Sequence, residues 1–516
     1  MRPLIRTALL LALGTTPFAC SYRPARFAAD PPVTAVSDMA PIPVPRKLNP
    51  VKEIYYTDAY VRRPIVLAMD PEVPVESGDV NALDEVPRSS WFDPPDARAD
   101  GPPVLPLLPV SAAVSGQPGL AVTDARGLRY ELRRDAKERP ELISASAAVS
   151  SRLLGAIGYR TAEVHVITVA PGDLKEGVDK AAQEAVSDLL HAGSPPVGDR
   201  YRVRATRWPV GIDLGPTPVA GVHAGDDNDK VSHAERRTLR ALGLALYWMD
   251  LQRLPPFALR DVYVGDPGKG HLLHYIVAMD DAFGANAVGR EAEARLGGQG
   301  KYLNENALTA LLTLGLRRRV APPVQTRWLS LGEFQDADAP EEFTTSPPYE
   351  PADKLRPADA YWMGKRLAAV PAEAITAALI AAHFSDVSAR ARVAEVLETR
   401  RDRAVAWAFS LVTPAEVERI EPGRLVLRDQ ARTRKIKALL ADSYAVTFLD
   451  DHGATVAPPI VVPVPDAAVS IPLPPGVPDY LVVRATALRE SGKAPRAFEV
   501  HVFKDPSGLR VLGVVH

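Results

Sequence analysis

The sequence contains a single cysteine, Cys20, in 516 residues. A lone thiol cannot form an intrachain disulfide, so the mature chain suits an oxidising compartment without depending on one. An excess of charge of either sign is also missing, because 61 basic residues face 63 acidic ones. A net charge of −2 provides no electrostatic attraction to nucleic acid, so we exclude nucleic acid as a partner.

Several catalytic signatures are absent as well. The sequence has no Gly-x-x-x-x-Gly-Lys-Ser/Thr phosphate loop, Gly-x-Ser-x-Gly elbow, His-Glu-x-x-His or Cys-x-x-Cys motif. The ten histidines are dispersed, and the spacing of His271 and His274 puts them on opposite faces of a strand. We expect His274 to be a buried, hydrogen-bonded histidine rather than a ligand.

The N-terminus has the clearest local signal in the chain. Arg2 and Arg6 give a positive start, and Ala8–Leu13 is an apolar core too short to span a bilayer. The segment Pro17–Cys20 resembles a bacterial lipobox, in which the cysteine carries lipid after cleavage. This predicts a lipid-anchored protein at the periplasmic face or outer membrane. The alternative is a plain secretory signal that ends near Ala19.

The length and composition of the chain predict several domains. With 46% apolar and 24% charged residues the chain is globular, and 516 residues exceed one ordinary domain. We expect a signal peptide over 1–19, a proline-rich tether and arm over 20–100, an α+β core over 101–420 and a β-sandwich over 421–516. Within the arm, Trp91 and its neighbour Phe92 are expected to anchor it on a neighbouring domain.

Alternating apolar patterns begin in the predicted core at Leu120. They predict a hairpin, a helix that ends at a glycine, a further strand, an amphipathic helix and another strand. This order is typical of the small lobe of kinase-like folds. In sequence the predicted elements are Leu120–Thr123, Leu128–Arg133, Ser144–Ile157, Ala162–Val169, Asp173–His191 and Tyr201–Trp208.

A buried helix is predicted over His233–Asp250, where leucines recur at helical spacing. A hairpin of Val262–Val264 and Leu272–Val277 follows, and then the acidic pair Asp280 and Asp281. A protein kinase has the same order of elements, a helix, a loop, a hairpin and an acidic end, around its catalytic loop and metal-binding aspartate. The preceding run Asp226–Asp229 lacks the glycine and glutamate of a calcium loop and is predicted to be solvated.

Helices and then short strands complete the pattern. The helices are predicted over 308–316, 357–367, 372–383 and 387–410, with Glu398–Arg403 as a solvated, mixed-charge face. Strands separated by turn residues then predict the β-sandwich. These strands are Arg424–Arg428, Ser443–Leu449, Ala468–Leu473, Tyr480–Leu488, Phe498–Phe503 and Leu509–Val514.

Six ordered phrases in the sequence resemble a family of secreted bacterial proteins whose core is similar to HipA-like and spore-coat CotH-like kinases. The resemblance implies a two-lobed, kinase-like α+β core. The phrases span residues 85 to 402 and are Glu85-Val-Pro-x-Ser-Ser-Trp-Phe92, Arg152-Leu-Leu-x-x-x-Gly-Tyr159, His233-x-x-Arg-Arg-x-Leu-Arg240, His274-Tyr-Ile-Val277, Arg356-Pro-Ala-Asp-Ala-Tyr-Trp362, and Phe384-Ser-Asp386 with Arg400-Arg-Asp402.

The same resemblance indicates where phosphotransfer residues should stand, and this chain departs from the pattern. Arg133 falls at the position of the strand lysine, Ala147 near that of the helix glutamate, and Ala278 at that of the metal aspartate. The loop Leu251–Ala258 has no base and no metal ligand at the expected places. The kinase-like core is therefore expected to be degenerate, with no cofactor and no catalytic residue.

One-residue or two-residue shifts could restore an acidic pair from Asp250, Asp261, Asp280 and Asp281. If the cleft binds a ligand, Arg133, Asp280 and Asp281 are the candidate binding residues. The sequence favours a non-catalytic binding or scaffolding lipoprotein of the cell envelope, held at the membrane by its lipid and able to bind an envelope protein. An active kinase-like enzyme and a purely structural lipoprotein remain the alternatives.

Overall fold

The computed structural model describes most of the chain beyond residue 100. The described residues are 24, 26, 27, 45, 91, 100–112, 119–191, 193–218, 221–223, 225–226, 232–252, 254, 258–285, 312–313, 327–336, 339–345, 349–490 and 494–516. They form two compact units, which we call the core unit (Val86–Phe409, with Thr34–Asp79) and the β unit (Ser410–His516, with Met1–Val33 and Val80–Glu85). No helix among them is long and apolar enough to cross a membrane.

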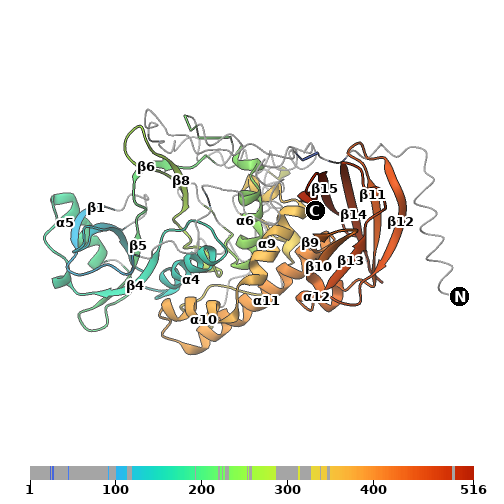
Figure 1. Cartoon of the computed structure of the whole chain (residues 1–516). Helices are drawn as coiled ribbons and strands as arrows, with labels where there is room; N and C mark the ends of the chain where they lie inside the picture. Colours follow the sequence, from blue (N-terminus) through green and yellow to red (C-terminus); the bar gives the residue numbers. More distant parts are fainter. Residues whose placement is uncertain are drawn as a thin grey trace. The chain divides into compact units, whose positions relative to one another are not determined.

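The core unit begins with a five-stranded antiparallel sheet of order β1-β2-β3-β5-β4, which we call the small-lobe sheet (Figure 1). Helix α4 follows β3 and helix α5 follows β4, so the predicted sequence of hairpin, helix and strand is present. The bounds are β1 Leu108–Ala112, β2 Leu120–Thr123, β3 Arg129–Arg133, α4 Leu142–Ala156, β4 Val164–Val169, α5 Lys180–His191 and β5 Tyr201–Arg207.

One face of the small-lobe sheet forms a compact hydrophobic cluster with α5. Alternate strand residues such as Leu120, Val122, Leu132 and Val203 supply its fully buried side chains, as the two-residue period of a strand requires. Polar residues at every second position are thereby directed to the opposite face. That opposite face carries the charged side chains considered below.

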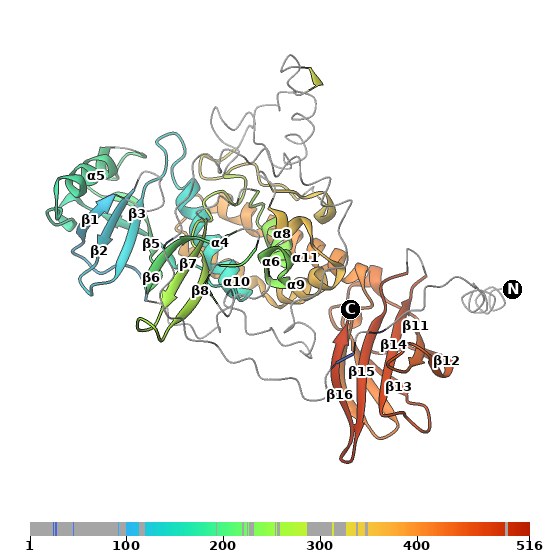
Figure 2. The ribbon, with the colours of Figure 1, turned by 90° about the horizontal axis from the view of Figure 1, so that it is seen from above.

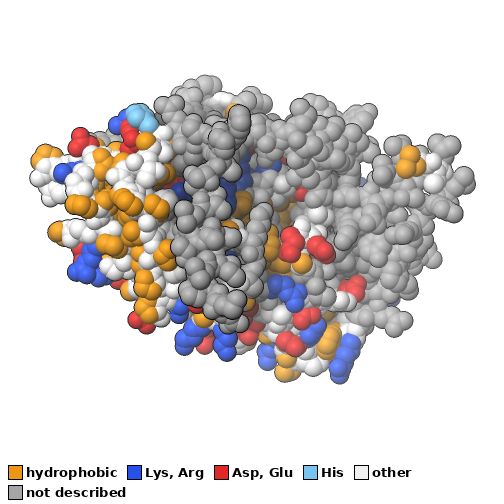
Figure 3. Space-filling view, turned by 90° about the vertical axis from the view of Figure 1, so that its right-hand side faces the viewer, with side chains coloured by type: hydrophobic (Ala, Val, Ile, Leu, Met, Phe, Trp, Pro, Cys, Tyr) orange, Lys and Arg blue, Asp and Glu red, His pale blue; other side chains and the backbone are white. Residues whose placement is uncertain are grey.

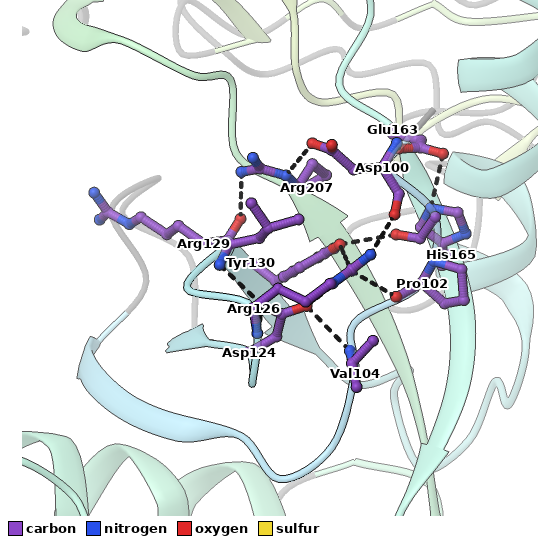
Figure 4. Close-up of polar contacts among 12 residues, drawn as sticks. Asp100, Pro102, Val104, Asp124, Arg126, Arg129, Tyr130, Glu163, His165 and Arg207 are labelled. Atoms are coloured by element: carbon purple, nitrogen blue, oxygen red, sulfur yellow. Dashed lines mark hydrogen bonds and ion pairs between the residues drawn. The ribbon is translucent and has the colours of Figure 1, made fainter. Parts of the chain in front are cut away.

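A polar network closes the β2–β3 hairpin and attaches the preceding chain to it (Figure 4). Asp124 accepts hydrogen bonds from the backbone N–H of Val104 and Leu128, and Arg126 Nε donates to it at 2.8 Å. Burial raises the pKa of Asp124, but these hydrogen bonds outweigh it, and the pKa lies below its usual value. Arg207 donates to Asp100 at 2.7 Å. The segment that leads out of the N-terminal arm is thus fixed by charge-assisted bonds.

A three-stranded sheet of order β6-β7-β8 lies beside the small-lobe sheet and is followed by helices (Figure 2). Ile276 of β8 is joined to the chain before β4, because Ala162 N donates to its carbonyl at 3.0 Å. The bounds are β6 Ile212–Pro216, α6 Arg237–Trp248, β7 Leu259–Val264, β8 His271–Ile276, α8 Glu350–Asp353, α9 Pro357–Ala369, α10 Ala372–Ala381 and α11 Val387–Leu411.

Helix α6 is buried on every side, as its run of leucines and alanines predicts. It packs on α8 and α9, and Gly243 allows Ala352 to approach so closely that a Cβ would lie 2.8 Å from the alanine methyl. Arg240 reaches from α6 to α9, where its Nε donates to Asp359 at 2.6 Å. The helix is therefore fixed by shape and by a buried ion pair together.

Arg400 of α11 contradicts the solvated face predicted for Glu398–Arg403. Its side chain is fully buried, and its guanidinium lies 4.3 Å from the ring centre of Tyr247. The same guanidinium donates to the carbonyl of Tyr247 at 2.6 Å and to that of Gln335 at 2.7 Å. Carbonyl and aromatic partners satisfy the charge, which is how a basic residue can lie inside a helix interface.

The β unit contains a three-stranded sheet of order β13-β10-β9 and a five-stranded sheet of order β12-β11-β14-β15-β16. Both contribute to one hydrophobic core, which confirms the predicted sandwich. The bounds are β9 Ala415–Glu421, β10 Arg424–Asp429, β11 Ser443–Leu449, β12 Thr455–Pro463, β13 Ala468–Pro472, β14 Tyr480–Leu488, β15 Phe498–Asp505 and β16 Gly508–Val515. On the face shown in Figure 3, hydrophobic side chains gather on the left of the described surface, and acidic and basic side chains are mixed along its lower part.

Candidate functional site

Two arginines on neighbouring strands form the centre of the candidate site. Arg133 of β3 and Arg204 of β5 are direct cross-strand partners, so their side chains leave the same face of the small-lobe sheet. Both are at least nine-tenths buried. Two like charges at this spacing destabilise a sheet unless an anion lies between them. The two arginines therefore require a negative charge on this face of the small-lobe sheet.

Asp280 supplies that charge. Its Oδ1 accepts a hydrogen bond from Nη1 of Arg204, and its Oδ2 lies 3.6 Å from Nη1 of Arg133. The side chain of Asp280 is 21% exposed. Each oxygen of Asp280 thus faces a guanidinium, and the carboxylate belongs to an ion cluster rather than to open solvent.

Glu131 completes the cluster from the same strand as Arg133. Its Oε1 lies 2.6 Å from Nε of Arg133. Burial and the nearby charge of Arg204 lower the pKa of Arg133, while Glu131 and Asp280 oppose this effect. Two guanidiniums and two carboxylates balance formally, so the cluster can exist within a largely buried face.

Helix α4 holds the segment that carries Asp280. Ser146 Oγ donates to the carbonyl of Ala282 at 2.9 Å, and Ser150 Oγ is 3.2 Å from the carbonyl of Met279. Ala147, at the position where a kinase-like helix would have glutamate, is 2% exposed and has no charge to offer. The helix therefore contributes hydroxyl groups that position a backbone, and no carboxylate that could orient Arg133.

Asp250 lies directly after α6 in a left-handed backbone conformation with φ of 49°. It is 1% exposed, its Oδ1 accepts from Nε2 of Gln252 at 3.0 Å, and Nη2 of Arg400 lies 3.7 Å away. Leu251 and Ala258 are fully buried. The carboxylate at this turn has internal partners, which makes it a structural group in this conformation.

Asp261 is the most deeply embedded carboxylate near the predicted acidic positions. It lies within β7 and is fully buried. Nδ1 of His223 and Nδ1 of His274 each lie 2.6 Å from its oxygens, and Thr217 donates at 2.5 Å. Burial raises the pKa of Asp261, but the two histidines and Thr217 outweigh it, and the pKa is far below its usual value.

His274 is buried, as predicted, and its side chain contacts the N-terminal arm. The indole of Trp91 stacks on the imidazole at 4.6 Å between ring centres and 17° between planes, and Trp91 is fully buried. The backbone N–H of Arg160 donates to the carbonyl of Trp91 at 2.7 Å. Trp91 is therefore an anchor of the arm on the core unit, as predicted, whereas Phe92, the other half of the predicted pair, lies outside the described residues.

The structure brings together Arg133 and Asp280 among the residues proposed for ligand binding. Asp281 is the half-buried neighbour of Asp280. Cys20 and the residues 227–229 of the acidic run lie outside the described residues. Sequence inspection missed Glu131 and Arg204, although the alternation of charged and apolar residues along β3 and β5 was a usable signal that these side chains lie on the face opposite the apolar core. Within the described part of the chain, no three His, Cys, Asp or Glu side chains are arranged to hold a metal ion.

No protein-family model and no curated protein matches this chain. Among solved structures, the chain is similar to a crystal structure of the Golgi casein kinase, with 10% sequence identity and a TM-score of 0.30 over 60% of this chain and 74% of that one. A second structure of the Golgi casein kinase, with Mn and ADP bound, gives 9% identity and a TM-score of 0.30 over 59% and 73%.

Proposed function

We propose that this chain is a lipid-anchored protein of the bacterial cell envelope whose kinase-like core binds or scaffolds an envelope partner without transferring phosphate. The lipid would be attached at Cys20, as the sequence before it suggests. The observation that supports the non-catalytic role is the pairing of Asp280 with Arg133 and Arg204. Phosphotransfer would need this carboxylate to bind magnesium and the strand cation to bind phosphate.

The remaining carboxylates support the same proposal. Magnesium needs carboxylate oxygens that are free to coordinate it in a near-octahedral shell. Asp261 accepts from two histidines and a threonine, and Asp250 from Gln252. In this arrangement Asp250, Asp261 and Asp280 are all held by protein partners. A binding or scaffolding role needs the shape of the core and not this chemistry.

The test is a nucleotide titration followed by a transfer assay. The purified protein is heated with ATP and Mg²⁺, and its melting temperature is compared with that of the protein alone. A shift without phosphate transfer supports a nucleotide-binding scaffold, and no shift supports a scaffold that binds no nucleotide. Phosphate transfer that disappears in Asp280→Ala would contradict the proposal and identify an active kinase-like enzyme.

A further inference from the structure

The five-stranded sheet of the β unit has an apolar patch on its outer face. Leu481 and Val483 of β14 point into the sandwich core, so Tyr480 and Val482 must point away from it. Yet both are buried, and with Leu449 and Leu512 they form a second hydrophobic cluster. A strand that is buried on both faces requires a cover on its outer side.

Phe27 of the N-terminal tether is that cover. We call the other cluster members, Leu449, Tyr480, Val482 and Leu512, together with the neighbouring His501, the tether-docking surface. Phe27 is 3% exposed and belongs to the same cluster. Its ring centre lies 4.6 Å from that of His501. The tether-docking surface is thus a hydrophobic site, and the aromatic ring of Phe27 fills it.

Polar contacts fix the direction of the tether on this surface. The backbone N–H of Phe27 donates to Tyr480 Oη at 2.8 Å, and Tyr480 Oη lies 3.0 Å from Nδ1 of His501. Nη1 of Arg26 pairs with Oδ2 of Asp451 at 3.1 Å, and its guanidinium lies 5.6 Å from the ring centre of Tyr480. A hydrogen bond, an ion pair and a buried ring together hold the two consecutive residues Arg26 and Phe27, which indicates a specific binding site for the tether.

The short stretch of sequence between this docking site and the predicted lipid site limits how far the β unit can lie from the membrane. Five residues lie between Cys20 and Arg26, so even a fully extended tether spans only about 20 Å. We infer that the tether-docking surface holds the β unit within this distance of the membrane surface. This inference depends on the proposed lipid attachment at Cys20.

Docking itself is tested without lipid, in full-length Cys20→Ser protein. Hydrogen exchange at the amide of residue 27 is measured in this parent, in Phe27→Ala and in Val461→Ala, whose side chain is 47% exposed on β12. We expect at least tenfold protection in the parent and in Val461→Ala and its loss in Phe27→Ala. Unprotected exchange in the parent would overturn the docking, because the amide would then have no lasting hydrogen bond.

Membrane proximity is tested with the lipidated full chain. Acylation leaves no other thiol, so Thr455→Cys, at an exposed site on β12, accepts a single fluorescent donor. Energy transfer to acceptor lipids in phosphatidylethanolamine–phosphatidylglycerol vesicles should fall at least twofold when Phe27→Ala is added. Equal transfer in the two proteins would overturn the inference. If the protein does not bind vesicles, the proposed anchor and the placement both fail, while protection of the Phe27 amide still reports docking.

Discussion

Nδ1 of His274 lies 2.6 Å from Oδ1 of Asp261 in a part of the core unit where both side chains are at most 1% exposed. His223 occupies the other oxygen of the same carboxylate. Asp261 therefore connects β7, β8 and the segment after β6 through a single charged group. Such a buried charge stabilises a fold only while all of its partners remain in place.

Asp261→Asn should lower the free energy of unfolding by roughly 3–5 kcal/mol, since it removes the buried charge and replaces one of the two acceptor oxygens with an NH2 donor that faces a buried partner. Urea denaturation of the full chain measures the effect. Asp266→Asn in the exposed β7–β8 turn is the matched control and should leave the midpoint nearly unchanged. A similar midpoint for both variants would show that Asp261 is not a structural centre.

Asp280→Asn should also destabilise the core unit, by roughly 1–3 kcal/mol, because Arg133 and Arg204 then face each other without the carboxylate. Adding Arg204→Met removes that repulsion, so the double variant should lose less than the sum of the two single variants. A double-variant cycle in urea measures this coupling. Strict additivity would argue that Asp280 is free for another role, such as metal binding.

Trp91→Ala should cost about 3–5 kcal/mol, the usual loss for a large aromatic side chain removed from a packed site. The arm would then lose its ring contact with His274. The comparison is Trp328→Ala, whose indole is half-buried and bonded to the hydroxyl of Ser388 at an exposed site. We expect a clearly smaller loss there, measured by the shift in thermal midpoint. Equal losses would mean that the arm is not anchored at Trp91.

The β unit should lose stability as the pH falls from about 6.5 toward 4. Burial lowers the pKa of His501 from 6.5 to about 4, so the folded state binds fewer protons than the unfolded state in this window. The contribution is fully present above the unfolded pKa and is lost as protons bind to the unfolded chain. At most it amounts to on the order of 3 kcal/mol.

The titratable groups in contact with His501 are Tyr480 and Glu499. Arg26 lies over the ring of Tyr480 and pairs with Asp451. Unfolding of the full chain followed between pH 7 and 4.5 measures the dependence. His501→Gln should flatten it in this window, because the substituted side chain does not titrate. An unchanged slope in His501→Gln would assign the pH dependence to other groups.

The sequence predicted most elements well where one face was apolar and the other was not. Leu120–Thr123 and Ser443–Leu449 have the same bounds in the structure as in the prediction. The strands that were missed, β1, β6, β9 and β12, each lie at the edge of a sheet. Edge strands tolerate prolines and polar residues because half of their backbone groups need no partner, so β12 with its Pro-Pro pair had no strand pattern to detect.

The candidate site was less predictable, for a physical reason. Arg133 and Asp280 are distant in the sequence and meet because β3 and the segment after β8 approach across the fold, which no local pattern encodes. Arg400 was different, because a usable signal existed. It occupies the apolar stripe of α11 with Val393, Val396 and Ala404, and helical spacing would have placed it inside.

The contacts of Trp91 predict what happens to the N-terminal part of the chain after proteolytic cleavage. The residue is held through its ring by His274 and through its carbonyl by the N–H of Arg160, and neither contact depends on the peptide bonds that follow it. A protease that cut the chain between residues 92 and 99 would sever the covalent connection and leave these contacts intact. The released N-terminal fragment, with any lipid it carries, would therefore stay attached to the core unit until denaturant separated the two.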